Sequence, residues 1–342
     1  MPDTTTQMRR EIDEIPDAVD RLLTEGADLI AQTANEIRAS DPRFLISVAR
    51  GSSDHACSFL KYASELLLGL PMASVGPSVK SIYGVDMRCE DAICISVSQS
   101  GQSPDIVQLT QSLTSGGAYS VAITNNPASA LAEAAAATLP IHAGPELSVA
   151  ATKTFVTSLV AGLWLIAQVK RDDHLLGAIH GLPESLSTAI ACDWSAVADA
   201  VDGRSLFTLG RGLSLAISNE AALKFKETCQ IHAESYSAAE VLHGPVSIVD
   251  QGFPVLALSS GDAAEDNLAE VADALASKGA VVFATTGRVK HATELPHVRT
   301  SHWMTDPIPT IAAFYGMVEK VATQRGIDPD TPRHLKKVTE TV

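Results

Sequence analysis

The sequence predicts an α/β protein with two tandem domains, each a doubly wound parallel sheet flanked by helices. From Phe44 onward, short apolar runs alternate with segments of helix length. Continuous apolar runs of this kind are typical of strands buried on both faces of a parallel sheet. A second series of such runs follows residue 200 and matches the first in detail. A repeat at this spacing predicts a duplicated domain that binds ligands at the carboxyl ends of its strands.

The elements can be placed in chain order. Helical periodicity over residues 8–39 predicts one or two N-terminal helices. Between the two series of strands, a helix at 152–170 and a polar segment at 171–200 mark the boundary. The predicted strands are 44–49, 92–98, 119–124 and 137–142, then 205–210, 254–260, 280–286 and 297–302. We therefore predict N-terminal helices at 1–40, domains at 41–185 and 195–328, and a C-terminal tail at 329–342.

Matching segments of the two halves support the duplication. SVARGSS (47–53) corresponds to TLGRGLS (208–214), since each gives a strand, a glycine turn, a hydroxyl and a helix. SVSQSGQSPD (96–105) likewise corresponds to LALSSGDAAED (256–266). The segment of the second half has fewer hydroxyl side chains than the matching segment of the first half. This difference predicts one active site for the two domains.

Composition excludes several classes of protein. A formal charge of −15 without a Lys/Arg cluster argues against a nucleic-acid surface. The five cysteines show neither CxxC nor zinc spacing, which predicts reduced thiols. We expect neither a metal nor another cofactor. The N-terminus lacks the apolar core of a signal peptide, and the longest apolar stretches are too short for a bilayer. We expect a cytoplasmic protein without a membrane partner.

The loop after the strand at 92–98 has the features of an anion site. Ser103 suits the N-cap of a following helix, Pro104 its first position and Asp105 its first turn. Backbone N–H groups at a helix N-terminus bind phosphate groups well. The alternative is a serine-rich turn that only caps its helix. Additional donors would be the hydroxyls of Ser98, Ser100 and Ser103.

The SQSG sequence of this loop resembles the phosphosugar loop of the sugar isomerase (SIS) family. Further segments, in the same order, resemble the isomerase half of glutamine–fructose-6-phosphate aminotransferase. They are ARGSSDHA (49–56), PELSVAATKTF (145–155), GRGLSLAISNEAALKFKE (210–227), IHAESYSAAEVLHGP (231–245) and PRHLKKVT (332–339). The resemblance extends from about residue 20 to the C-terminus and implies two tandem SIS domains of flavodoxin-like fold.

The resemblance also implies which residues hold the substrate, a sugar phosphate such as glucosamine 6-phosphate or fructose 6-phosphate. Val149 would line the sugar pocket, and Ala151 stands where the aminotransferase has a serine. The residues that would hold the phosphate and the sugar hydroxyls are Ser52, Ser53, Ser98, Gln99, Ser100 and Ser103.

The catalytic roles follow from the same resemblance. Glu227 corresponds to the base that moves a proton between C1 and C2, and Lys224 to a residue that contacts the intermediate. His243 corresponds to a residue that assists ring opening from the neighbouring subunit, which implies a homodimer. Lys337 corresponds to the tail lysine that forms a Schiff base with the ketose.

The chemistry of these residues is consistent with those roles, although each has an ordinary alternative. A carboxylate can move the proton, an ammonium can stabilise an oxyanion, and a lysine amine can add to a carbonyl. Lys224 and Glu227 could equally be a helix ion pair. His243 could be a turn histidine, and Lys336 and Lys337 could be solvated tail charges. His232 and Glu234 are interpreted as structural.

Several positions depart from the aminotransferase pattern. Arg50 replaces a small residue or cysteine, which predicts a different pocket entrance. Lys336 replaces the alanine before the tail lysine, so either amine could react. The loop reads Gln102-Ser103-Pro104 instead of Glu-Thr-Ala. Pro2 follows Met1, where a glutaminase half would begin with cysteine.

Without a glutaminase half, the expected reaction is deamination of glucosamine 6-phosphate to fructose 6-phosphate and ammonia. The alternatives are an aldose–ketose isomerase, an aminotransferase-like enzyme that uses free ammonia, and a fructosamine-phosphate deglycase. A non-catalytic sugar-phosphate sensor is the alternative from a different class.

Overall fold

The computed structural model describes residues 5–201, 203 and 205–337. The chain divides into two compact units. The first unit contains the described residues of 17–146, 153–180 and 336–337, and the second contains those of 5–16, 147–152 and 181–335. Residues 17–40 belong to the unit of the first sheet, and residues 147–152 belong to that of the second.

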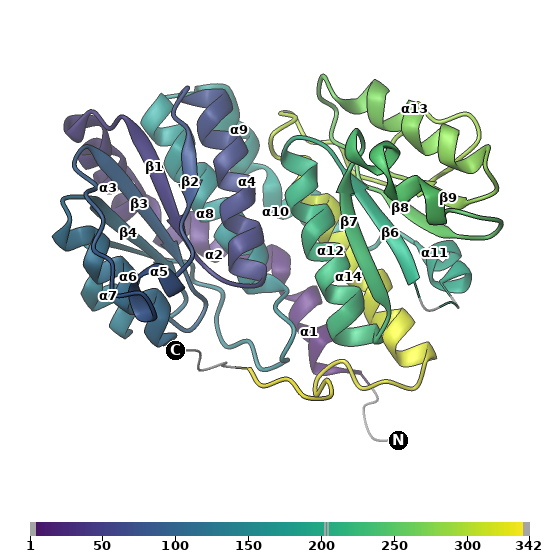
Figure 1. Cartoon of the computed structure of the whole chain (residues 1–342), viewed down its shortest axis with the longest axis horizontal. Helices are drawn as coiled ribbons and strands as arrows, with labels where there is room; N and C mark the ends of the chain where they lie inside the picture. The colour runs from purple at the N-terminus through teal and green to yellow at the C-terminus, as the bar shows by residue number, and fades with distance from the viewer. Residues whose placement is uncertain (1–4, 202, 204, 338–342) are drawn as a thin grey trace. The chain divides into compact units, whose positions relative to one another are not determined.

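The first unit contains a parallel sheet of five strands in the order β2-β1-β3-β4-β5 (Figure 1). Its strands are β1 (Phe44–Val48), β2 (Met72–Ser74), β3 (Ala92–Val97), β4 (Tyr119–Thr124) and β5 (Ala137–Pro140). Helices α6 (Pro104–Ser115) and α7 (Ala130–Ala134) cover one face. Helices α4 (Ser52–Leu67) and α8 (Lys153–Lys170) pack together on the other. The remaining helices are α2 (Ile15–Glu25), α3 (Ala27–Ser40), α5 (Ser78–Ser81) and α9 (Asp173–His180).

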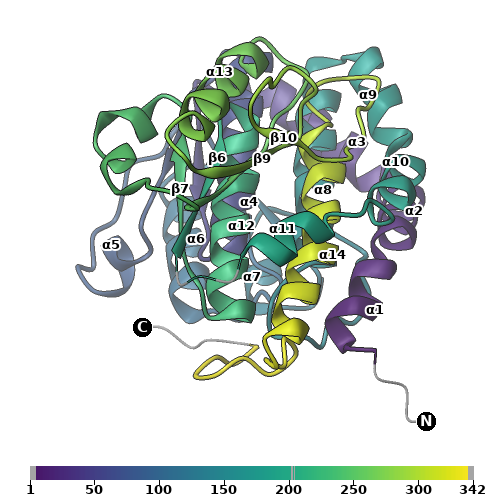
Figure 2. The same ribbon diagram turned by 90° about the vertical axis from the view of Figure 1, so that its right-hand side faces the viewer.

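The second unit repeats this topology with the order β10-β9-β8-β6-β7. Its strands are β6 (Ser205–Gly210), β7 (His232–Ser237), β8 (Pro254–Ala257), β9 (Val281–Ala284) and β10 (Thr293–Glu294). Helix α13 (Glu265–Ala276) covers one face, and α12 (Leu213–Cys229) lies beside α14 (Pro307–Gln324) in Figure 2. The others are α1 (Gln7–Asp13), α10 (Leu182–Ala189), α11 (Ser195–Ala200), η1 (Glu240–His243) and η2 (Pro245–Ile248).

Both sheets therefore place their second strand at one edge and then run first, third, fourth and fifth. This is the doubly wound order of flavodoxin-like domains, in which the connections diverge between the first and third strands. The predicted fold class and its duplication are confirmed. Seven of the eight predicted strands are present in the structure, with ends that differ by up to three residues.

The exception is the strand predicted at 297–302, which was wrong. In the structure this segment is a loop, whose Arg299 Nη1 donates to the Ser259 carbonyl and whose Thr300 N–H donates to Asp306 Oδ1. The last strand of the sheet is instead the short β10. The predicted one or two N-terminal helices are three, α1 to α3.

Helix α8 is the longest apolar segment of the first unit. Its residues Lys153 to Ala167 are all buried, because the helix packs against both α3 and α4. A helix that is apolar on nearly all sides is typical of a protein core. Within the described part of the chain, no helix has the length and apolarity needed to cross a membrane.

Candidate active site

The first unit brings two of the predicted binding segments together at the carboxyl edge of its sheet. Strands β1 and β3 are neighbours, and Val48 is in register with Ser96. Residues 49–53 and 98–103, which follow these strands, therefore leave the sheet side by side. This is the switch point of the doubly wound topology, where ligands bind in such folds.

The loop at 98–103 is organised by its own hydroxyls. Ser98 Oγ accepts a hydrogen bond from the Gly101 N–H (3.2 Å), and Ser100 Oγ accepts one from the Gln102 N–H (3.3 Å). Because a hydroxyl both accepts and donates, each serine keeps an O–H proton for a ligand. Ser103 is the N-cap residue of α6, and Pro104 is its first residue, as predicted. No capping bond of the Ser103 side chain is found among the described residues.

Gly101 makes this loop possible. It has φ 63°, and a Cβ at this position would lie 2.1 Å from Ser129 Oγ. The Gln99 carbonyl accepts hydrogen bonds from the Asn125 N–H (3.1 Å) and Thr124 Oγ1 (3.3 Å). The loop is therefore fixed against the end of β4.

Ser52 and Ser53 are the first two residues of α4, where N–H groups lack partners within the helix. The turn into α4 is made by Gly51, whose φ of 57° suits glycine. Just before it, Arg50 Nε lies 2.6 Å from Oδ2 of Asp105, in the first turn of α6. The N-termini of α4 and α6 thus flank the same loop.

The second unit holds the predicted base and its lysine on α12. Nζ of Lys224 forms ion pairs with Glu227, one turn later, and with Oε1 of Glu220 (3.2 Å), one turn earlier. Lys224 and Glu220 are fully buried, whereas the Glu227 side chain is 22% exposed. Tyr315 on α14 donates from its hydroxyl to Glu220 Oε1 (3.3 Å). The resulting cluster has a buried ammonium and one carboxylate that solvent can reach.

The two carboxylates determine the charge of Lys224. Burial alone would lower the pKa of the ammonium, but the charges of Glu220 and Glu227 raise it above its ordinary value. Lys224 therefore stays protonated at neutral pH and cannot serve as a base. Its chemical use is that of a fixed positive charge beside Glu227.

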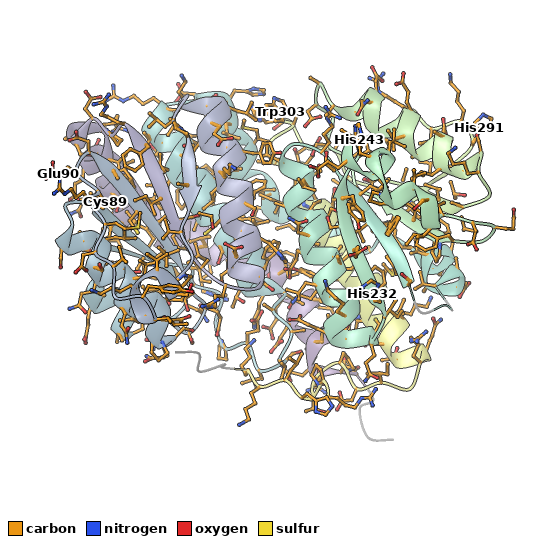
Figure 3. All side chains as sticks on the ribbon, viewed as in Figure 1. Cys89, Glu90, His232, His243, His291 and Trp303 are labelled. Carbon is orange, nitrogen blue, oxygen red and sulfur yellow. The ribbon has the colours of Figure 1, made fainter. Side chains whose placement is uncertain are left out.

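The cluster of Lys224, Glu220 and Glu227 does not lie at the carboxyl edge of its sheet, where ligands bind in doubly wound folds. Helix α12 begins after the carboxyl end of β6 and ends just before the amino end of β7. Lys224 and Glu227 lie in its last two turns, toward the opposite edge of the sheet. His243 ends η1, beyond the carboxyl end of β7, and Figure 3 shows His232 and His243 at opposite ends of that strand. Since β7 has six residues, about 20 Å separates the two edges.

His232 and Glu234 lie on β7, the edge strand of the second sheet. His232 Nδ1 is 3.4 Å from Ser205 Oγ, and Glu234 Oε2 accepts a hydrogen bond from the Tyr236 hydroxyl (2.7 Å). These contacts are consistent with the structural interpretation of both residues.

Val149 and Ala151 belong to the segment 147–152 of the second unit. The Val149 N–H donates to the Asp330 carbonyl (3.3 Å). The Asp330 carboxylate in turn accepts from the N–H groups of Gln7 and Met8 (2.7 Å each), at the start of α1. The segment is thus tied to the chain that leads into the C-terminal tail.

The tail lysine is held in the first unit. Nζ of Lys337 lies 2.8 Å from Oε2 of Glu146, whose side chain is fully buried. Thr154 donates to the same carboxylate through its N–H (3.1 Å) and its Oγ1 (2.6 Å). Lys336, the other tail amine, is exposed. Of the two tail amines, Lys337 is therefore the one that this carboxylate holds in place.

Both sheets of the chain match one known protein family. The model of the SIS domain matches residues 40–168 and 201–294, which cover both sheets. The chain belongs to the SIS domain family. The two matched ranges correspond to the duplicated halves of the fold.

Relatives and solved structures agree with this membership. Glutamine–fructose-6-phosphate aminotransferase (isomerizing) of Sulfolobus acidocaldarius is 33% identical over 341 residues, covering 96% of this chain and 56% of that protein. This chain therefore spans about half the length of such relatives. A protein of Silicibacter pomeroyi with the provisional name phosphosugar isomerase is 62% identical, with a TM-score of 0.93 over 95% of this chain and all of that one. The C-terminal domain of glucosamine-fructose-6-phosphate aminotransferase from Francisella tularensis is 25% identical, with a TM-score of 0.82 over 97% and 100%.

Two residues of these clusters were missed in the sequence. Glu220 lies four residues before Lys224, a spacing that brings side chains together on a helix. Its burial against Tyr315 could not be read from that spacing. Glu146 lies in the PELSVAATKTF segment, but its partner Lys337 is 191 residues away.

Proposed function

We propose that the protein converts glucosamine 6-phosphate and water to fructose 6-phosphate and ammonia. The observation that carries the proposal is the α12 cluster, in which Glu227 is reachable by solvent and lies beside the buried ammonium of Lys224. A carboxylate can move a proton between adjacent carbons, and a fixed ammonium can stabilise the negative charge that develops. Membership of the SIS family and the names of the relatives support a sugar phosphate as the substrate.

The reaction divides into steps that these residues can perform. The loop at 98–103 and the N-terminus of α4 bind the phosphate. After ring opening, Glu227 removes the proton from C2 and returns it to C1, so that an enolamine becomes the imine of the ketose. The buried charge of Lys224, beside Glu227, stabilises the negative charge that develops on the oxygen at C1 through its electrostatic field. Hydrolysis of the C2 imine then releases ammonia.

Lys337 would take part in that last step. Its neutral amine adds to the imine carbon, ammonia leaves, and water hydrolyses the Schiff base to the ketose and the free lysine. Addition requires the lysine to lose a proton first. Glu146, at 2.8 Å, is placed to accept this proton, and its two bonds from Thr154 hold the carboxylate in position.

For His243 we propose a role in ring opening on a second copy of the chain, in a homodimer. Within its own unit His243 lies past the carboxyl end of β7, about 20 Å from the edge where α12 ends. The side chain is exposed, as are Leu242 (45%) and Ile248 (55%) beside it. An exposed histidine among exposed apolar residues fits a surface that meets another subunit.

The main test is Glu227→Gln with a panel of hexosamine phosphates. Because the amide cannot accept the proton, we expect ammonia release to fall about 10²–10⁴-fold while fructose 6-phosphate still binds. In D₂O the wild type should place deuterium at C1 of the product, and the variant should not. Glu270→Gln, an exposed carboxylate of α13, is the control and should behave as the wild type.

The panel also separates this reaction from its alternatives. The name of the Silicibacter pomeroyi relative favours a simple phosphosugar isomerase as the second candidate. Exchange of deuterium without ammonia release would support that candidate. Synthesis of amino sugar from fructose 6-phosphate and free ammonia would support an aminotransferase-like enzyme. Cleavage of a fructosamine phosphate without release of ammonia would support a deglycase. Binding of a sugar phosphate without any deuterium exchange or ammonia release would support a non-catalytic sensor.

The role of His243 can be tested by mixing two inactive variants. If Glu227 and His243 act from different copies, Glu227→Gln and His243→Ala protomers should together regain part of the activity after subunit exchange. Recovery should be absent when either variant is mixed with itself. A mixed dimer without any activity would contradict the proposal.

A further inference from the structure

The ion pair between Arg50 and Asp105 crosses the switch point of the first sheet. Asp105 is fully buried in the first turn of α6, and its Oδ2 lies 2.6 Å from Nε of Arg50. The Arg50 side chain is 48% exposed, so a ligand can reach it while it cannot reach Asp105. A buried carboxylate is costly unless it is paired, which explains why Arg50 holds this position.

The backbone register places Arg50 beside the phosphate loop. Val48 pairs with Ser96, so Arg50, two residues further, leaves the sheet alongside Ser98. Asp105 lies just after the other end of the loop. The guanidinium therefore spans the loop from the end of β1 to the start of α6. It also precedes the N-terminus of α4, which begins at Ser52.

Arg50 can supply a positive charge that the side chains of the loop at 98–103 lack. The loop side chains that would hold the phosphate are neutral (Ser98, Gln99, Ser100 and Ser103), and the buried carboxylate of Asp105 just after the loop repels a phosphate dianion. Only one of the five N–H donors of the guanidinium is used on Asp105 Oδ2 in this pair. The other N–H groups suit the oxygens of a phosphate, which arginine binds in a bidentate manner.

We propose that Arg50 is a substrate-binding residue that contacts the phosphate group of the sugar phosphate, and that Asp105 is the positioning residue that directs it there. This inference rests on the proposed function, since it assumes that the loop at 98–103 holds the phosphate. It adds a charged group to a site that otherwise binds through neutral donors.

The second unit contains a matched arginine for comparison. Arg211 precedes Gly212, whose φ of 60° and ψ of −133° repeat the φ of 57° and ψ of −134° of Gly51. Arg211 Nη1 donates to the neutral Asn267 Oδ1 at 2.8 Å. The same backbone thus presents an arginine in both copies, but only Arg50 is anchored to a buried carboxylate beside a hydroxyl-rich loop.

The test is equilibrium binding of inorganic phosphate and of fructose 6-phosphate, measured by calorimetry on the full chain. Arg50→Gln should bind both about 10- to 100-fold more weakly, the effect of losing charge-assisted hydrogen bonds. Arg211→Gln is the matched control and should bind both as the wild type does. The kinetic counterpart is a raised KM of Arg50→Gln with kcat largely retained.

The double variant Arg50→Gln/Asp105→Asn separates direct contact from simple neutralisation. It leaves no unpaired buried charge, so it remains testable even where Arg50→Gln alone does not fold. Affinity as weak as that of Arg50→Gln supports direct contact. Wild-type affinity in the double variant would mean that Arg50 only neutralises Asp105 and would overturn the proposal. Wild-type affinity in Arg50→Gln overturns it while the proposed function stands, whereas a wild type that binds neither ligand removes both.

Discussion

The loop after β3 and the loop after β8 occupy the same place in two sheets of the same topology, yet they differ in charge and in hydrogen bonding. In the first, the N–H groups of Gly101 and Gln102 donate to the hydroxyls of Ser98 and Ser100, so these bonds leave the hydroxyl protons of both serines unused. In the second, the Gly261 N–H already donates to Oδ2 of Asp306 (2.8 Å), and the Ala264 N–H donates to Oδ1 of Asp262 (2.8 Å). Ser260 Oγ is paired with the hydroxyl of Ser214 (2.7 Å).

If the first loop holds the phosphate as we propose, the difference shows how one copy of a duplicated domain can keep its fold without keeping the anion site. In the second loop, the carboxylates of Asp306 and Asp262 accept the hydrogen bonds of backbone N–H groups that a phosphate would otherwise need. Arg299 then compensates the acidic cluster by binding Oε1 of Glu265 (2.8 Å) and the carbonyl of Ser259 (2.7 Å). Topology is set by strand order and apolar packing, whereas ligand binding depends on a few polar side chains at the strand ends.

The largest expected effect in this comparison comes from the glycines of the two loops. Gly101→Ala would place a Cβ 2.1 Å from Ser129 Oγ at φ 63°, whereas Gly261→Ala would meet Asp306 Oδ2 only at 3.2 Å. We expect Gly101→Ala to destabilise the loop by about 2–4 kcal/mol and to abolish detectable phosphate binding. Gly261→Ala should still bind. Calorimetry with fructose 6-phosphate measures both, and equal losses in the two variants would contradict the assignment of the site to the first loop.

The serines of the two loops should give a smaller, graded difference. Ser98→Ala and Ser100→Ala should each raise the KM for the phosphorylated sugar, because each removes one hydrogen-bond donor. The loss of one donor should cost about 1–3 kcal/mol of binding free energy. Ser260→Ala should leave the KM unchanged and instead lower the melting temperature, because it leaves the buried Ser214 hydroxyl without this bond. Steady-state kinetics and thermal melts on the same preparations check the prediction. Unchanged KM values for both first-loop variants would place the phosphate elsewhere.

The smallest expected effect concerns the ionisation of Asp262 in the loop after β8. Burial, together with the charges of Glu265 and Asp306, raises the pKa of Asp262 above its ordinary value of 3.8. The folded state therefore binds the Asp262 proton more tightly than the unfolded state. The free energy of unfolding consequently falls as the pH rises from the ordinary pKa of 3.8 to the raised pKa of the folded state. Asp262→Asn should raise the melting temperature slightly at pH 7, with a gain that shrinks as the pH falls toward 4. A gain independent of pH would show that charge is not its cause.

Much of this comparison could be predicted from the sequence. The loop at 98–103 was identified because an apolar run, a glycine and an N-cap followed one another, and all three are local signals. The duplication was visible for the same reason in SVARGSS and TLGRGLS. The polar edge strand β7 and the three-residue β2 were missed, since neither has the continuous apolar run that marks a central strand.

The internal partners of the side chains could not be predicted. The pairing of Lys337 with Glu146 joins residues far apart in the chain, and so do the contacts of Tyr315 with Glu220 and of Arg50 with Asp105. No periodicity or propensity encodes such contacts, because they depend on how finished elements come together. The roles of Glu227, His243 and Lys337 remain predictions that rest on the resemblance.

The division of the chain between the two units has a consequence for its biosynthesis. The chain passes from one unit to the other five times, after residues 16, 146, 152, 180 and 335. A ribosome delivers the sheet of the first unit long before Lys337, which follows the whole of the second sheet. The contact between Lys337 and Glu146 can therefore form only after the whole second sheet has been synthesised. A nascent chain would thus acquire the loop at 98–103 early and the contact of Lys337 late, and if Lys337 acts as we propose, the reaction must wait for the second sheet.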